Sequence, residues 1–152
     1  MLIYTGDCSR RSNEDVAIST TSEYELALFP LNTVLFPTTF LPLRIFEARY
    51  VDLISRCMRD DGGFGVIAIM DGAETGAPAK THSIGTLARI VDFDQGDDGL
   101  LNIVIRGEER FRLRGTEVQA DNLVMGRIAD LDNVEQLPIP EEFRTRFELI
   151  RV

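Results

Sequence analysis

Residues 28–62 read LFPLNTVLFPTTFLPLRIFEARYVDLISRCMRDDG, and this stretch decides the fold. Its second half repeats apolar residues at the 3.6-residue spacing of an amphipathic helix, which predicts a helix over about residues 46–60 that ends at Gly62. The predicted apolar stripe consists of Phe46, Tyr50, Leu53, Ile54, Cys57 and Met58. We expect this stripe to face the core, with Arg49, Asp52 and Arg56 facing water on the opposite side.

Three prolines interrupt the apolar residues before this helix, at Pro30, Pro37 and Pro42. Proline cannot donate a hydrogen bond to a sheet and forces extended geometry on the preceding residue. The stretch therefore predicts two short strands, over about residues 24–29 and 38–43, joined by a stiff loop. This segment carries more large apolar side chains than a short loop needs, and we expect part of them to stay exposed as polypeptide-binding candidates: Leu31, Val34, Leu35, Phe36 and Phe40.

The rest of the chain alternates short apolar runs with polar turns. Strands are predicted over residues 64–70, 83–94, 101–106, 110–114 and 123–131, with a polar loop over 71–82 and turns at 95–99 and 107–109. Six or seven mostly hairpin-connected strands with one early helix predict an α+β, mainly β fold that resembles a barrel.

The sequence divides into three parts. Residues 1–22 form a polar extension, residues 23–132 the β domain, and residues 133–152 a linker with the start of a C-terminal helix. A single helix of this length is marginal alone, so we expect its deletion to leave the β domain folded.

The proline-rich stretch resembles the opening motif of the Lon N-terminal domain family, which includes many standalone bacterial proteins. The similarity rests on FPL at 29–31, VLFP at 34–37, LPL at 41–43 and IFEARY at 45–50, and it covers roughly residues 24–131. The motif positions are Pro30, Pro37, Pro42, Phe46, Glu47, Arg49 and Tyr50, and Ala48 stands where many members have proline. The resemblance implies a PUA-like pseudo-barrel with the helix packed against it. It also implies substrate recognition, the role of this domain in the ATP-dependent Lon protease.

The composition of the chain argues against several classes of partner and of binding site. The 25 acidic and 16 basic residues give a net charge of −9, which argues against nucleic acid as a partner. No apolar run approaches the ~18 residues of a membrane span, and residues 1–22 lack the apolar core of a signal peptide. Two cysteines provide no metal cluster, and an unpaired Cys57 suits the reducing cytoplasm.

The sequence patterns that could indicate catalysis or ion binding do not match the motifs that such sites require. Residues 74–81 lack the glycines of a phosphate-binding loop, and the aspartates at 92, 94, 97 and 98 lack the spacing of a calcium loop. His82 is the only histidine and no nucleophile motif accompanies it, while Glu47 and Arg49 fit a structural pair at the helix start. We therefore expect no catalytic residue, no metal and no cofactor.

Three functions remain open. The first is a noncatalytic module that binds unfolded or exposed polypeptide, with a protease or chaperone system as a further candidate partner. The second is a standalone hydrolase or peptidase, which His82 and nearby acidic residues in a cleft would favour. The third is an RNA-binding PUA-like domain. It would need an unpaired face of Arg106, Arg110, Arg112 and Arg114, which we expect instead to pair with Glu108, Glu109 and Glu117.

Overall fold

The computed structural model of the protein describes residues 22–132. The polar extension before Ser22, most of the linker and the predicted C-terminal helix lie outside these residues. The elements in chain order are β1 (Glu23–Leu31), β2 (Phe40–Ile45), α1 (Ala48–Asp60), β3 (Gly63–Asp71), β4 (Lys80–Gln95), β5 (Leu101–Val118) and β6 (Val124–Asp130). Their order confirms the predicted mainly β fold with one early helix.

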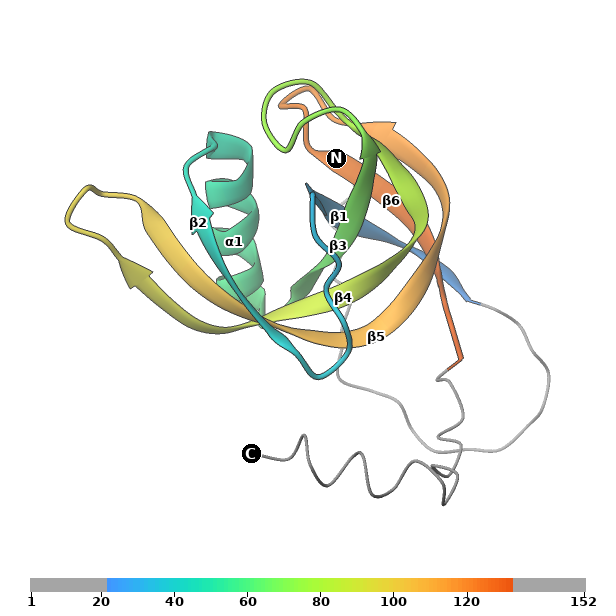
Figure 1. Cartoon of the computed structure of the whole chain (residues 1–152), viewed down its shortest axis with the longest axis horizontal. Helices are drawn as coiled ribbons and strands as arrows, with labels where there is room; N and C mark the ends of the chain where they lie inside the picture. Colours follow the sequence, from blue (N-terminus) through green and yellow to red (C-terminus); the bar gives the residue numbers. More distant parts are fainter. Residues whose placement is uncertain (1–21, 133–152) are drawn as a thin grey trace, which may run out of the picture.

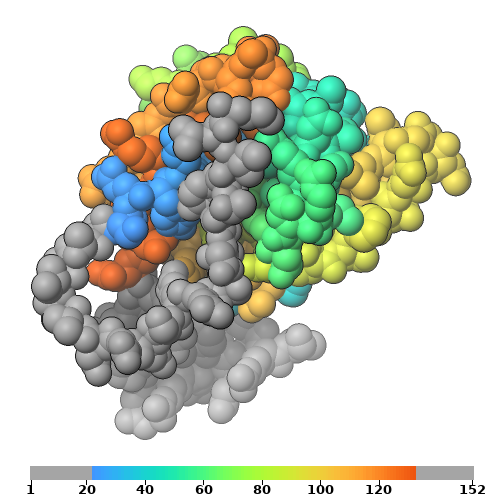
Figure 2. Space-filling view, turned by 180° about the vertical axis from the view of Figure 1, so that it is seen from behind, coloured from blue at the N-terminus to red at the C-terminus, as the bar shows by residue number. Residues whose placement is uncertain are grey.

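The strands form one sheet in the order β2-β5-β4-β3-β1-β6, which closes into a barrel because β5 also pairs with β6 (Figure 1). Residues 101–106 of β5 pair with β2, and residues 111–118 pair with β6. Among the strand pairs of residues 22–132, β1 and β3 alone are parallel, and the other pairs are antiparallel. The ends of β4 and β5 continue as a hairpin that projects from the body, as Figure 2 shows from the opposite side.

The predicted turn at residues 107–109 is wrong, because β5 runs through it without a break. Gly107 is needed for a close approach. Its N–H donates to the carbonyl of Thr39 at 2.9 Å, and its own carbonyl accepts from the Thr38 N–H at 2.8 Å. A Cβ on Gly107 would lie 2.2 Å from the carbonyl oxygen of Phe36. Only glycine therefore lets residues 30–42, which we call the proline loop, lie against β5.

One apolar cluster fills the barrel. Leu28, Ile67, Phe111 and Ile128 are its most buried members, each at most 1% exposed. Glycine makes room for the largest of them, since a Cβ on Gly85 would lie 2.4 Å from the Phe111 ring. A small residue opposite a large one is how a narrow barrel is packed without voids or clashes.

A second cluster lies between α1 and the sheet. Figure 1 shows α1 in the angle between the barrel and the projecting hairpin. Tyr50, Leu53, Ile54 and Cys57 are buried there, which confirms most of the predicted stripe. The ring of Tyr50 stacks on Phe29 with centroids 3.9 Å apart. Burial of this face is what stabilises a helix of only thirteen residues.

Two predicted members of the stripe are not in the core. Phe46 is 59% exposed, and Met58 is 39% exposed. The helix begins at Ala48, with Glu47 still in extended geometry, so Phe46 precedes the first turn and does not share the direction of the buried face. Met58 lies in the last turn, where the stripe leaves the core.

Arg49 was predicted to face water, but it is only 7% exposed. One of its terminal nitrogens donates to the carbonyl of Asn122 at 2.7 Å, and the other lies 3.0 Å from a Glu47 carboxylate oxygen. Its guanidinium carbon lies 4.7 Å from the centre of the Tyr50 ring. Arg49 thus joins the first turn of α1 to the connection between β5 and β6, a contact that helical spacing alone does not reveal.

Candidate functional site

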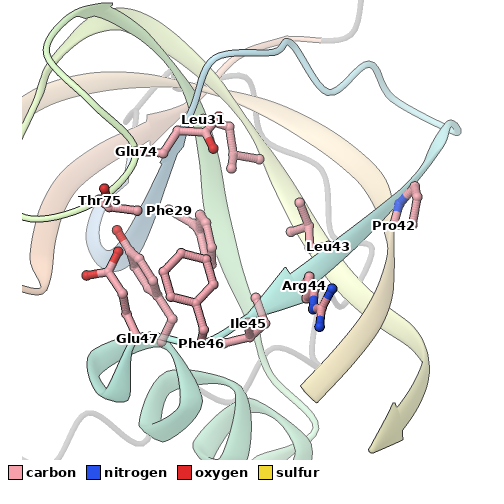
Figure 3. Close-up of a pocket in the computed structure, with 11 residues that line it drawn as sticks. Phe29, Leu31, Pro42, Leu43, Arg44, Ile45, Phe46, Glu47, Glu74 and Thr75 are labelled. Atoms are coloured by element: carbon pink, nitrogen blue, oxygen red, sulfur yellow. The ribbon is translucent and has the colours of Figure 1, made fainter. Parts of the chain in front are cut away.

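A cavity of about 160 Å³ opens between β1, β2, the start of α1 and the loop after β3 (Figure 3). Figure 3 shows Phe46 and Glu47 on the α1 side of the cavity, and Leu31 and Glu74 on the opposite side. The lining residues come from all four segments: Phe29, Leu31, Pro42, Leu43, Arg44, Ile45, Phe46, Glu47, Tyr50, Glu74 and Thr75.

The cavity runs along one edge of β2. Four consecutive residues of this strand, Pro42 to Ile45, line the cavity. Because neighbouring side chains of a strand point to opposite faces, a cavity that touches all four residues follows the edge of the strand. Among the described strands β2 is the last in the sheet order, so this edge has no neighbouring strand in residues 22–132. Pro42 suits such an edge because it has no N–H to donate to a neighbour.

The walls of the cavity are mostly apolar. Phe29 and Leu31 come from β1, Leu43 and Ile45 from β2, and the exposed ring of Phe46 stands beside the opening. Tyr50 lies between these walls and is 5% exposed. Its hydroxyl makes no hydrogen bond to any residue in the described range.

Three charged side chains line the cavity, and two of them have partners. Glu47 pairs with Arg49, and Arg44 pairs with Asp98 in the β4–β5 turn. Glu74 accepts a hydrogen bond from the Asn32 N–H at 2.6 Å and forms no ion pair with a described cation. Burial is the main reason that the pKa of Tyr50 is raised; Arg49 lowers it, while Glu47 and Glu74 both raise it further. The hydroxyl therefore lies near the positive charge of Arg49 as well as near two carboxylates.

The proline loop separates its apolar residues into two groups. Leu31 and Leu35 are buried, each 4% exposed, and Leu31 also lines the cavity. Val34, Phe36 and Phe40 are 58%, 63% and 63% exposed, and we call these three side chains the proline-loop surface. Their burial could not be read from the sequence, because all five candidates are equally apolar.

The proline loop is held firmly from beneath. Thr86 donates its hydroxyl to the Leu35 carbonyl at 2.6 Å, in a buried position on β4. The paired backbone groups of Thr38, Thr39 and Gly107 attach its other end to β5. The exposed side chains of the loop are thus presented from a backbone that is bonded on both sides.

The residues that the hydrolase and RNA-binding alternatives would use lie on two adjacent strands, β4 and β5. His82 lies on β4 rather than in the predicted loop, and its side chain is exposed. Residues 22–132 contain no group of three His, Cys, Asp or Glu side chains able to hold a metal. The predicted pairing of Glu108 with the arginines of β5 is wrong, since Glu108 lies 3.3 Å from Arg89 of the adjacent strand. Arg114 instead approaches Glu23 at 3.8 Å.

No helix in the described range is long and apolar enough to cross a membrane. The helix α1 has thirteen residues, and a charged side chain occurs at several of its positions.

Comparison with known proteins agrees on one family. Residues 25–151 match the ATP-dependent protease La (LON) substrate-binding domain. Lon protease 2 of Syntrophobacter fumaroxidans is 33% identical over 101 residues, which are 65% of this chain, and the chain spans 13% of the length of that protease. A Lon N-terminal domain protein from Xanthomonas campestris has a crystal structure that superposes with a TM-score of 0.72 at 36% identity, covering 83% of this chain and 70% of that one. The N-terminal domain of the Mycobacterium avium complex Lon protease has a TM-score of 0.58 at 13% identity, covering 80% and 61%, and it shows the shared fold alone.

Proposed function

The chain belongs to the family of ATP-dependent protease La (Lon) substrate-binding domains, and from this premise we propose that it binds unfolded or exposed polypeptide without cleaving it. The proposal concerns this domain's own surface, because the chain corresponds to a small part of the full-length proteases that it matches. A bound polypeptide would then be available to a protease or chaperone system in the same compartment, which we take to be the cytoplasm.

The observation that carries this proposal is the proline-loop surface. Three large apolar side chains are more than half exposed on one short segment, where their exposure to water is unfavourable unless a partner covers them. The loop below them is fixed by the Thr86 hydrogen bond and by the pairing with Gly107. A surface that is already ordered loses little conformational entropy on binding, which favours even a small contact.

Binding through this surface needs no nucleotide, metal or titrating base. A small apolar interface predicts an affinity of about micromolar or weaker. Because apolar contact rather than charge would drive the interaction, the affinity should vary little with salt concentration.

The test is a fluorescence titration with unfolded casein, with a natively folded protein as the reference ligand. We expect Phe36→Ser to weaken casein binding severalfold, because it removes one of the largest exposed side chains of the loop. Phe93→Ser is the matched control, since Phe93 is 56% exposed on β4 and lies outside the proline-loop surface. Equal binding of casein and the folded protein, or equal loss in both variants, would refute the proposal.

Casein integrity is followed in the same samples to test the hydrolase alternative. We expect no cleavage by the wild-type protein. Cleavage that disappears in a His82→Ala variant would replace the binding proposal with a hydrolytic one.

A further inference from the structure

We propose that the cavity beside β2 binds an arginine or lysine side chain of the polypeptide, next to the apolar segment that the proline-loop surface contacts. This inference rests on the proposed function and adds a chemical preference to it. It predicts that preferred segments combine bulky apolar residues with a neighbouring basic residue.

The chemistry of the lining matches a basic side chain along its whole length. Phe29, Leu31 and Leu43 provide apolar walls for the methylene stem, while Glu74 provides a carboxylate for the cationic head. Lysine and arginine bury their stems against apolar surface in this way while their charge reaches a polar partner. An apolar side chain would cover the carboxylate without pairing its second oxygen, and an acidic one would meet its repulsion.

The charge balance of the cavity is also favourable. Arg44 and Arg49 are already engaged by Asp98 and Glu47, so neither cation is available to neutralise Glu74. The Asn32 N–H occupies one oxygen of Glu74, and the second oxygen is left for a ligand. A guanidinium or ammonium group there would form a charge-assisted hydrogen bond, the stronger class of such bonds.

Tyr50 supplies a second polar group on the cavity wall. Its side chain is mostly buried and lines the cavity, while its hydroxyl, which makes no hydrogen bond within residues 22–132, is not among the fully buried polar atoms. The N–H groups of a basic side chain would satisfy the hydroxyl oxygen from within the cavity.

The edge of β2 gives the polypeptide a path into the cavity. The strand edge is unpaired by described residues, and the cavity follows it from Pro42 to Ile45. An extended segment could lie along this edge and hydrogen-bond to the backbone, as in other cases of strand addition. Phe40, at the start of β2, belongs to the proline-loop surface, so one extended segment can reach both regions.

The experiment compares two short labelled peptides of the same apolar sequence, one with a central arginine and the other with citrulline. Citrulline keeps the shape of arginine and removes its charge. We expect the wild-type protein to bind the arginine peptide about threefold to tenfold more tightly, with a preference that declines at high salt. Glu74→Gln keeps the acceptor for the Asn32 N–H and removes the charge, so it should abolish the preference while leaving the citrulline peptide unaffected.

Glu25→Gln is the matched control, because Glu25 is exposed on β1, does not line the cavity and loses the same charge. A preference caused only by the overall charge of −9 would decrease equally in both variants, and that result would overturn the inference. Tyr50→Phe should weaken arginine binding alone, without altering the stacking on Phe29. Equal affinity of the two peptides for the wild type would refute the cavity preference and leave the proposed function standing. Failure of both peptides and of unfolded casein to bind would refute both.

Discussion

Replacement of Arg49 with methionine provides the sharpest test of the fold, because sequence and structure give opposite expectations for it. A water-facing arginine can be replaced at a cost of less than about 0.5 kcal/mol. In the structure, however, Arg49 is 7% exposed and holds the Asn122 carbonyl at 2.7 Å and Glu47 at 3.0 Å. Methionine fills much of the same space but can make neither contact.

The cost can be assembled from these contacts. The hydrogen bond from a charged donor to the Asn122 carbonyl is worth roughly 1.5–3 kcal/mol, and the partly exposed pair with Glu47 up to about 1 kcal/mol. Contact with the Tyr50 ring adds about 0.5–1 kcal/mol. The buried Nε atom of Arg49 has no hydrogen-bond partner within the described residues. Its removal therefore offsets the loss of stability by about 1 kcal/mol. We therefore expect the free energy of unfolding to fall by about 1–4 kcal/mol.

Urea denaturation followed by circular dichroism measures this change, and the midpoint should fall by about 1–3 M. Arg56→Met is the matched control, since Arg56 is exposed on the same helix and undergoes the same substitution. The control should stay within about 0.5 kcal/mol of the wild type. If both variants shifted equally, Arg49 would not carry the contact between α1 and the β5–β6 connection.

Three further changes test the core. Leu53→Ala should lower the free energy of unfolding by about 2–5 kcal/mol in the same urea assay, and a loss below about 0.5 kcal/mol would show that the helix face is misassigned. Gly85→Ala should destabilise by about 1–3 kcal/mol, because its Cβ would lie 2.4 Å from the Phe111 ring; an unchanged midpoint would mean that the barrel interior has spare room. Burial raises the pKa of Cys57 to about 11, so in a Cys8→Ser background a thiol reagent at pH 8 should modify the folded protein at least about 100-fold more slowly than the denatured one. The same shift in pKa lowers the free energy of unfolding as the pH rises from 9.0 to about 11, because the Cys57 thiol loses its proton at a lower pH in the unfolded chain than in the folded protein.

Local periodicity predicted the elements well, since it reflects contacts between near neighbours. The spacing of Tyr50, Leu53, Ile54 and Cys57 gave the buried face of α1 correctly. It failed where distant segments decide the outcome. Arg49 is buried by a connection that lies 73 residues further along the chain, which no helical pattern encodes. Gly107 resembles a turn residue locally, whereas its role is to let Phe36 approach β5.

The cavity was harder to predict for the same reason. Its lining combines β1, β2, α1 and the loop after β3, and only the first three belong to the motif that the sequence made visible. Glu74 lies in a loop of small polar residues where one carboxylate looks like any other. Its hydrogen bond to the Asn32 N–H brings it to the cavity, and nothing in the local sequence indicates that contact.

The pairing of β1 with β6 has a consequence for synthesis on the ribosome. Glu23 lies opposite Ala129, so the strand that is made first finds its antiparallel neighbour only after about a hundred further residues have been translated. Long-range pairing of this kind folds slowly and leaves intermediates exposed. Until β6 emerges, the nascent chain cannot close around Phe111, and the apolar side of β1 remains open to water. The unfinished domain therefore presents the same kind of extended apolar segment that we propose the finished domain binds.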